Sequence, residues 1–181
     1  MNDNYTKVGM GGGCHWCTEA VFQSLRGVKN VKQGWVASFD SATAFSEAVI
    51  VEYDPKEIPL EVLVSIHLHT HKSTSAHPMR KKYRSAVYVY NEAQEIHVAN
   101  ILQLQQHLFD RPLVTQILRF SAFKPSRKEI LNYYYSNPSK PFCKTYIAPK
   151  LRLLLTKFNT YTRQDDLQSV LPSESKDLES N

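Results

Sequence analysis

The chain has 181 residues, 42% of them hydrophobic, which is enough for one domain with a substantial core and too few for two. Its net charge of +5 comes from Lys and Arg residues that are scattered rather than massed in a block, so we expect no nucleic-acid partner. No apolar run approaches the roughly 20 residues of a membrane helix, and the first residues do not form a secretory signal. We therefore expect a cytoplasmic protein with no membrane partner.

Strand and helix patterns alternate along the chain. Strand patterns cover residues 5–10, 30–39, 46–54, 83–90 and 113–120, and helical patterns cover 14–25, 53–69 after an initial turn, 91–108 and 125–138. Asn91 is a candidate N-cap, and Gly27 is a candidate end for the first helix. This order predicts an α+β sandwich of one mixed sheet with helices packed on it.

The end of the chain differs in composition from the rest. Residues 164–181 are polar, acidic and free of aromatic side chains, which is typical of a disordered segment. We therefore expect one domain over residues 1–163 and a disordered tail over 164–181.

Two cysteines stand where the first predicted helix begins. Three glycines precede Cys14, so its side chain is expected at the helix N-terminus, where unpaired amide groups and the helix dipole lower the pKa of a thiol. Cys17 follows one turn later on the same side, so a disulfide between the two is geometrically possible. With Cys143 the chain has three cysteines, an odd number, so we expect reduced thiols and at most a transient disulfide.

Other interpretations of these cysteines stay open at this point. A structural zinc site needs further ligands, and neither Cys143 nor the histidines form a second pair with zinc-ligand spacing. Both cysteines of the first helix can also be small buried hydrophobic residues, as free cysteines commonly are. A general CxxC thiol-disulfide oxidoreductase is a further alternative.

Four blocks of sequence resemble one known family. The stretch GGGCHWCTEAVFQSLRGV, followed by SEAVIVEYDP, KYRSAVY and NPSKPFCKTYIAPKL, is similar to the peptide methionine sulfoxide reductase A family over residues 7–153. The resemblance implies a ferredoxin-like two-layer sandwich, with residues 1–163 as its catalytic domain. It also implies a thiol enzyme that reduces the S epimer of methionine sulfoxide, free or in proteins. We expect a monomer without a bound cofactor, supplied with electrons by thioredoxin or dithiothreitol.

The family reaction assigns roles to residues of this chain. A sulfoxide sulfur is electrophilic only when its oxygen is stabilised as it gains charge or a proton, so a thiolate and a proton donor are needed. By the resemblance, Cys14 is the catalytic nucleophile and becomes a sulfenic acid, while Glu47 is the acid, kept protonated by an apolar setting. Tyr83 would hydrogen-bond the same oxygen. Trp16 would form an aromatic wall for the substrate methyl group, with His15 in a position where the family usually has Phe.

A second thiol must resolve the sulfenic acid. Cys17 is close to Cys14 in sequence, but a disulfide across the first helical turn needs local fraying. Cys143 lies in a stretch rich in Pro, Ser and Lys that is expected to be mobile, and it matches the family's usual resolving position. We favour Cys143 as the resolving cysteine and keep Cys17 as the alternative.

The chain also departs from the family pattern. Segment 35–46 is shorter than the usual family loop and lacks its second oxygen-binding tyrosine, and Pro78 stands where the family has an aspartate. These departures leave a non-catalytic or altered-substrate member of the same fold as an alternative.

Residues 67–82, from the end of the second predicted helix to the start of the fourth strand, are rich in basic side chains. Its histidines could invite a transition metal, but the family uses none, so we expect no metal site. Its cations could bind an acidic substrate or partner. The histidines are His67, His69, His71 and His77, and the cations are Lys72, Arg80, Lys81 and Lys82.

Overall fold

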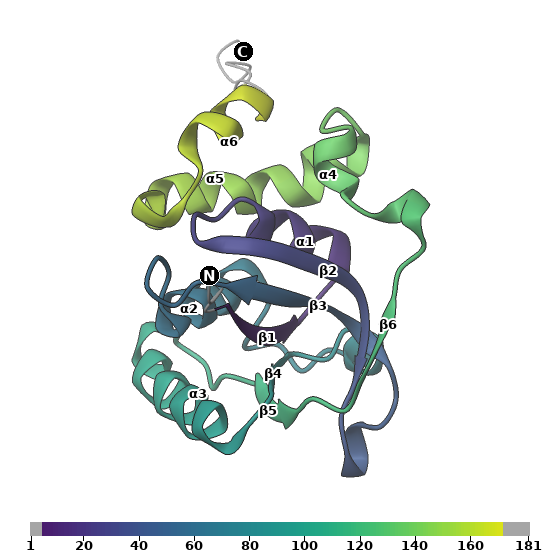
Figure 1. The fold of residues 1–181 in the computed structure, drawn as a ribbon, viewed down its shortest axis with the longest axis vertical. Helices are drawn as coiled ribbons and strands as arrows, with labels where there is room; N and C mark the ends of the chain where they lie inside the picture. The colour runs from purple at the N-terminus through teal and green to yellow at the C-terminus, as the bar shows by residue number, and fades with distance from the viewer. Residues whose placement is uncertain (1–4, 172–181) are drawn as a thin grey trace, which may run out of the picture.

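A six-stranded mixed sheet forms the centre of the fold in a computed structural model, which describes residues 5–171 (Figure 1). The strand order is β5-β4-β1-β3-β2-β6, and all neighbours are antiparallel except β4 and β5. Strand β3 lies inside the sheet and is buried on both faces, which explains its nearly continuous apolar sequence. The strands are β1 Thr6–Gly11, β2 Val28–Ala37, β3 Ser46–Tyr53, β4 Ala86–Val89, β5 Gln116–Arg119 and β6 Ala122–Pro125.

The helices enclose the larger hydrophobic core with the sheet. Figure 1 shows α4, α5 and α6 gathered at one end of the molecule beyond α1, with α3 at the opposite end. No helix within residues 5–171 is long and apolar enough to cross a membrane. The helices are α1 His15–Gln23, α2 Leu60–Thr70, α3 Glu92–Gln105, α4 Tyr133–Ser136, α5 Ala148–Lys157 and α6 Gln164–Val170.

The predicted fold class is confirmed. The unit β1-α1-β2-β3-α2-β4 with the spatial order β4-β1-β3-β2 is the ferredoxin-like arrangement. As predicted, the Asn91 side chain caps α3 by accepting a hydrogen bond from the amide of Gln94 at 2.8 Å. Gly27 has a φ of +82° in the turn between α1 and β2. Helix α1 begins a few residues after the end of β1, a strand that pairs with both β3 and β4. The N-terminus of α1 therefore lies beside these two strands.

The prediction of one helix over residues 125–138 is wrong. Residues up to Pro125 pair as β6 with β2, and only Tyr133–Ser136 form a short α-helix. Asn132 takes a left-handed conformation with φ of 53°, which interrupts a continuous helix. The buried carboxylate of Glu19 in α1 accepts hydrogen bonds from the amides of Asn132 and Tyr133 at 2.9 and 3.3 Å. This long-range anchor outweighs the local helical preference.

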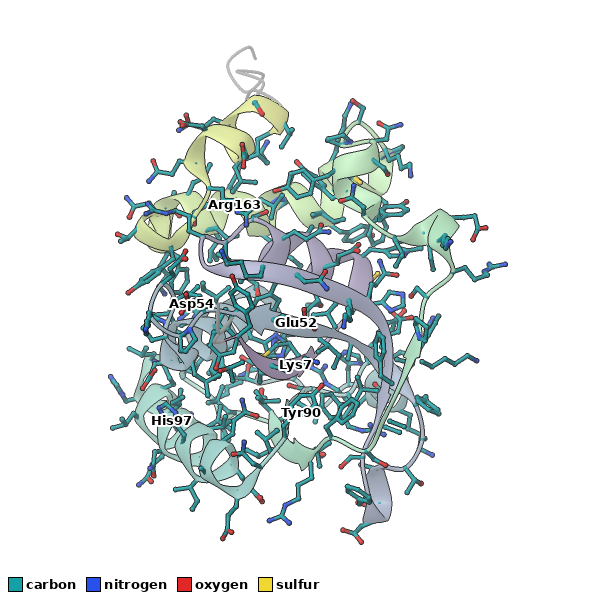
Figure 2. All side chains as sticks on the ribbon, in the orientation of Figure 1. Lys7, Glu52, Asp54, Tyr90, His97 and Arg163 are labelled. Carbon is teal, nitrogen blue, oxygen red and sulfur yellow. The ribbon has the colours of Figure 1, made fainter. Side chains whose placement is uncertain are left out.

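The expectation of a disordered segment from residue 164 is wrong for its first part. Residues Gln164–Val170 form α6, and the side chain of Leu167 is fully buried. Just before this helix, the guanidinium of Arg163 donates hydrogen bonds to the carbonyls of Leu25 and Val28 at 3.2 and 2.9 Å (Figure 2). The ordered part of the chain thus extends to at least α6, and the remainder of the expected tail, residues 172–181, lies outside the described residues.

Candidate active site

The glycine loop after β1 is clamped to the segment before β4. The guanidinium of Arg80 donates hydrogen bonds to the carbonyls of Gly12 and Tyr83, both at 3.0 Å. A Cβ atom at Gly12 would lie 2.5 Å from the His71 ring, so a larger residue would push the loop away. Arg80 and Gly12 together hold Tyr83 close to the start of α1.

Cys14 occupies the N-cap position of α1 and is half-buried. The pKa of its thiol is lowered mainly by a hydrogen bond from the Cys17 side chain. The amides of Trp16 and Cys17 lower this pKa further, while burial and the nearby Glu47 charge oppose them. These features confirm the predicted helix N-terminal environment and make Cys14 a thiol suited to nucleophilic attack.

Cys17 is buried one turn further along α1, in hydrogen-bond contact with Cys14. Its pKa is raised, first because its thiol donates that hydrogen bond to Cys14, and then because burial disfavours the thiolate. A cavity of about 50 Å³ lies beside both cysteines and is also lined by Lys150. The charge of Lys150 works in the opposite direction and favours the Cys17 thiolate.

Cys143 does not lie in a mobile stretch, contrary to the expectation from its neighbours in the sequence. It begins a π-helical turn, Cys143–Ile147, that continues into α5, and its exposed fraction is 0%. Burial raises the pKa of its thiol, and the charge of Lys140 opposes that rise. All three cysteines are free thiols.

The surroundings of Glu47 are polar, so the expected apolar setting is wrong. Glu47 lies in β3 with 7% of its surface exposed. Its Oε2 accepts a hydrogen bond from the backbone amide of His15 at 3.1 Å, which ties the carboxyl group to the residue next to Cys14. Its Oε1 lies 3.8 Å from Nζ of Lys82. Sequence reasoning missed this arrangement because the contacts join residues from three separate segments.

Hydrogen bonds between β3 and the loop before β4 bring Tyr83 close to Glu47. The Glu47 amide and the Ser46 hydroxyl both donate to the carbonyl of Lys82, at 3.0 and 2.9 Å. The Ser46 hydroxyl in turn accepts a hydrogen bond from the Arg84 amide at 2.8 Å. Tyr83 is half-buried, and Nζ of Lys82 lies 5.0 Å from the centroid of its ring.

The side chain of His15 is buried rather than open to solvent, with 4% of the residue exposed. Its Nδ1 lies 2.7 Å from the carbonyl oxygen of Gly34, which can only accept, so Nδ1 carries a hydrogen. Its Nε2 lies 3.8 Å from Oε2 of Glu47. The ring also packs edge-on against Trp35, with the centroids 5.0 Å apart. In this structure His15 therefore contacts the carboxyl group as well as an aromatic side chain.

Trp16 belongs to an aromatic cluster that joins α1 to the segment before α5. Its ring stacks on Tyr133 with the centroids 4.0 Å apart, and Phe142 packs edge-on against it at 5.5 Å. One face of the Trp16 ring is thus covered by Tyr133. The position of Tyr133 depends on the Glu19 anchor described above, which no local sequence pattern indicates.

His67 and His71, two of the four histidines considered as metal ligands, lie one helical turn apart, with the rings stacked at a centroid distance of 4.2 Å. Nε2 of His67 lies 2.8 Å from the Gly11 carbonyl oxygen, and Nε2 of His71 lies 2.8 Å from the Ser85 hydroxyl. Burial lowers the pKa of His67 to about 4. Within residues 5–171, no three or more metal-ligating side chains gather into a metal-binding group. The two rings support the glycine loop.

Comparison with known proteins assigns the family. The family model described as peptide methionine sulfoxide reductase matches residues 6–162. The chain belongs to the peptide methionine sulfoxide reductase family. A curated relative from Campylobacter jejuni (strain RM1221), peptide methionine sulfoxide reductase MsrA, is 32% identical over 155 residues, covering 79% of this chain and 94% of the relative.

Solved structures share the fold. The reduced form of Mxr1 from Saccharomyces cerevisiae has a TM-score of 0.68 and 21% identity, covering 81% of this chain and 93% of that chain. The structure of Mxr1 in complex with Trx2 has a TM-score of 0.57 and 20% identity, covering 71% of this chain and 86% of that chain. As a member of this family, the protein is an oxidoreductase that acts on methionine sulfoxide through thiol chemistry.

Proposed function

We propose that this protein reduces the S epimer of methionine sulfoxide to methionine, with Cys14 as nucleophile and Glu47 as proton donor. One observation carries the assignment of these two residues. The hydrogen bond from the His15 amide to Glu47 fixes the carboxyl group beside the residue that follows the low-pKa thiol. A nucleophile and an acid on adjacent elements are what sulfoxide reduction requires.

In the first step, the Cys14 thiolate attacks the sulfoxide sulfur while Glu47 delivers a proton to the oxygen. The attack joins the Cys14 sulfur to the substrate sulfur; the protonated oxygen then moves to the Cys14 sulfur as this S–S bond and the S–O bond break, which leaves a Cys14 sulfenic acid and free methionine. The hydroxyl of Tyr83 supplies a further hydrogen bond to the oxygen. Trp16, backed by the stacked Tyr133, receives the methyl group. Lys82 and His15 flank the carboxyl group of Glu47.

The geometry favours Cys17 over Cys143 for the second step. Cys17 already contacts Cys14, whereas Cys143 is fully buried within a helical turn. Once Cys14 is a sulfenic acid, it no longer bears the negative charge that raises the pKa of Cys17, and the charge of Lys150 still favours the Cys17 thiolate. Attack by Cys17 then releases water and forms the Cys14–Cys17 disulfide.

The disulfide must receive two electrons and two protons before the next cycle. The Saccharomyces cerevisiae relative Mxr1 has been crystallised with Trx2, which supports a thioredoxin-like protein as the reductant here. The chemistry described needs no prosthetic group, because both electrons pass through cysteine sulfur.

Incubation of the protein with each epimer of methionine sulfoxide and dithiothreitol tests the proposal. We expect methionine from the S epimer alone, and about one equivalent per protein when no reductant is added. Cys14→Ser should abolish even this single turnover, because an unactivated hydroxyl is a poor nucleophile. Cys143→Ser is the matched control and should retain it. A protein that reduces disulfides but neither sulfoxide epimer would instead be a general thiol-disulfide oxidoreductase.

A further inference from the structure

Three lysines each lie over an aromatic ring that is near the start of α1 or near Glu47. Lys82 lies over Tyr83 with Nζ 5.0 Å from the ring centroid, Lys124 over Trp35 at 6.0 Å, and Lys140 over Tyr133 at 4.1 Å. We call this set the lysine rim. Its members come from the loop before β4, from β6, and from the turn between α4 and Cys143.

Each ring beneath the lysine rim belongs to or contacts the site. Tyr133 stacks on Trp16, and Trp35 packs against His15, so the rings under Lys140 and Lys124 contact the two residues that follow Cys14. Lys82 reaches the site directly through Glu47. Each lysine of the rim is thus linked, directly or through one ring, to Glu47 or to a residue that follows Cys14.

The charges of the rim are only partly compensated. Within the part of the chain that the structure describes, Lys124 and Lys140 form no ion pair with a carboxylate, and Lys82 is paired with the buried Glu47 alone. Lys29, which follows α1 in the sequence, provides a contrast. It also lies over a ring, that of Tyr5 at 5.4 Å, but Glu57 is 3.9 Å from its Nζ.

We propose that the lysine rim binds acidic side chains that flank an oxidised methionine, so that the preferred substrates are methionine sulfoxides within acidic peptide segments. This inference rests on the proposed function. A lysine held over a ring retains less freedom than an isolated one, so less freedom is lost when a carboxylate pairs with it. The preference comes from electrostatic attraction at an exposed surface, so salt weakens it.

The test compares three peptides that carry the S sulfoxide between two Glu, two Gln or two Lys residues on each side. Dithiothreitol is the reductant, so no charged protein competes for the rim. We expect kcat/KM to be highest for the Glu peptide, about tenfold above the Gln peptide at low ionic strength, and to converge at high salt. The Lys peptide should be the poorest substrate.

Lysine variants assign this preference to the rim. Lys124→Gln and Lys140→Gln should each lower the Glu-to-Gln ratio about two- to fivefold, as expected for single exposed ion pairs. Lys29→Gln is the matched control and should leave the ratio unchanged, because Lys29 lies over a ring outside the site. Circular dichroism and thermal unfolding verify that each variant is folded.

The outcomes separate the two proposals. Equal kcat/KM for the three peptides in an active enzyme would overturn the acidic preference and leave sulfoxide reduction intact. A Glu-to-Gln ratio as high in the Lys124→Gln/Lys140→Gln double variant as in the wild type would also overturn it, because two of the three rim lysines would then contribute nothing. Failure to reduce any of the peptides and free methionine sulfoxide would overturn the proposed function itself.

Discussion

Replacing Cys17 with Ala should slow the reaction of Cys14 with an alkylating agent. The Cys17 thiol donates the hydrogen bond that contributes most to lowering the pKa of Cys14. Alanine removes this donor and adds no charge. The amides of Trp16 and Cys17 belong to the backbone and stay in place, so Cys14 in the variant keeps part of its low pKa.

The size of the effect follows from the strength of the lost interaction. A hydrogen bond to an ionised group contributes about 1.5–3 kcal/mol, and a thiol is a weak donor, so the lower end applies. A loss of about 1.4 kcal/mol lowers the thiolate population about tenfold at a pH below the pKa. Because a more basic thiolate is also more nucleophilic, about half of this loss on a logarithmic scale is recovered. We expect alkylation to slow about three- to tenfold.

Iodoacetamide labelling of Cys14, followed over a range of pH by mass spectrometry of its peptide, measures this effect. Cys17→Ser is the matched control, because its hydroxyl can donate the same hydrogen bond and should keep Cys14 reactive. The reasoning would be refuted if Cys17→Ala and Cys17→Ser reacted at the same rate, or if alanine left the wild-type rate unchanged. Either result would mean that the helix N-terminus alone activates Cys14.

Three further predictions concern the acid, the third cysteine and the buried histidines. Glu47→Gln keeps a hydrogen-bonding group but cannot transfer a proton, so single-turnover sulfoxide reduction measured by rapid quench should slow about 10²–10⁴-fold. Cys143→Ser should still be recycled by thioredoxin in a coupled assay, whereas Cys17→Ser should form methionine once and stop. Because the pKa of His67 is about 4 in the folded protein and about 6.5 when unfolded, only the unfolded chain binds this proton at intermediate pH. The stability from His67 should therefore fall by about 2 kcal/mol between about pH 7 and pH 5, and urea unfolding of His67→Gln should lack this loss.

The fold was predictable because local patterns and global topology agree. The strand-like sequences of β1 and β2, the continuous apolar run of β3, and Asn91 before α3 each specify an element that the structure contains. The prediction failed over residues 125–138, where a buried carboxylate from a distant helix decides the backbone conformation. It also failed at α6, where the burial of Leu167 outweighs the polar composition around it.

The candidate site was predictable only in part. The environment of Cys14 follows from three glycines and a helix start, both of which are local features. The polar surroundings of Glu47 depend on Lys82 and on the His15 amide, which reach it from other segments. The order at Cys143 arises from packing against the core, although the residues around it are rich in Pro, Ser and Lys, as in a mobile loop. Contacts of this kind are set by tertiary structure and leave no trace in a short window of sequence.

The usual aromatic residue is absent at position 15, but the next residue, Trp16, keeps aromatic packing. Where His15 replaces the usual aromatic residue, its ring turns into the protein and contacts Glu47 and Gly34. Trp16, which we propose as the wall for the methyl group, is stacked on Tyr133. Lys140 lies over the ring of the same tyrosine, so a cation stands beside this aromatic pair. The substrate that we propose, a methionine sulfoxide flanked by carboxylates, fits both features, because the Trp16 ring would accept the methyl group and Lys140 the charge.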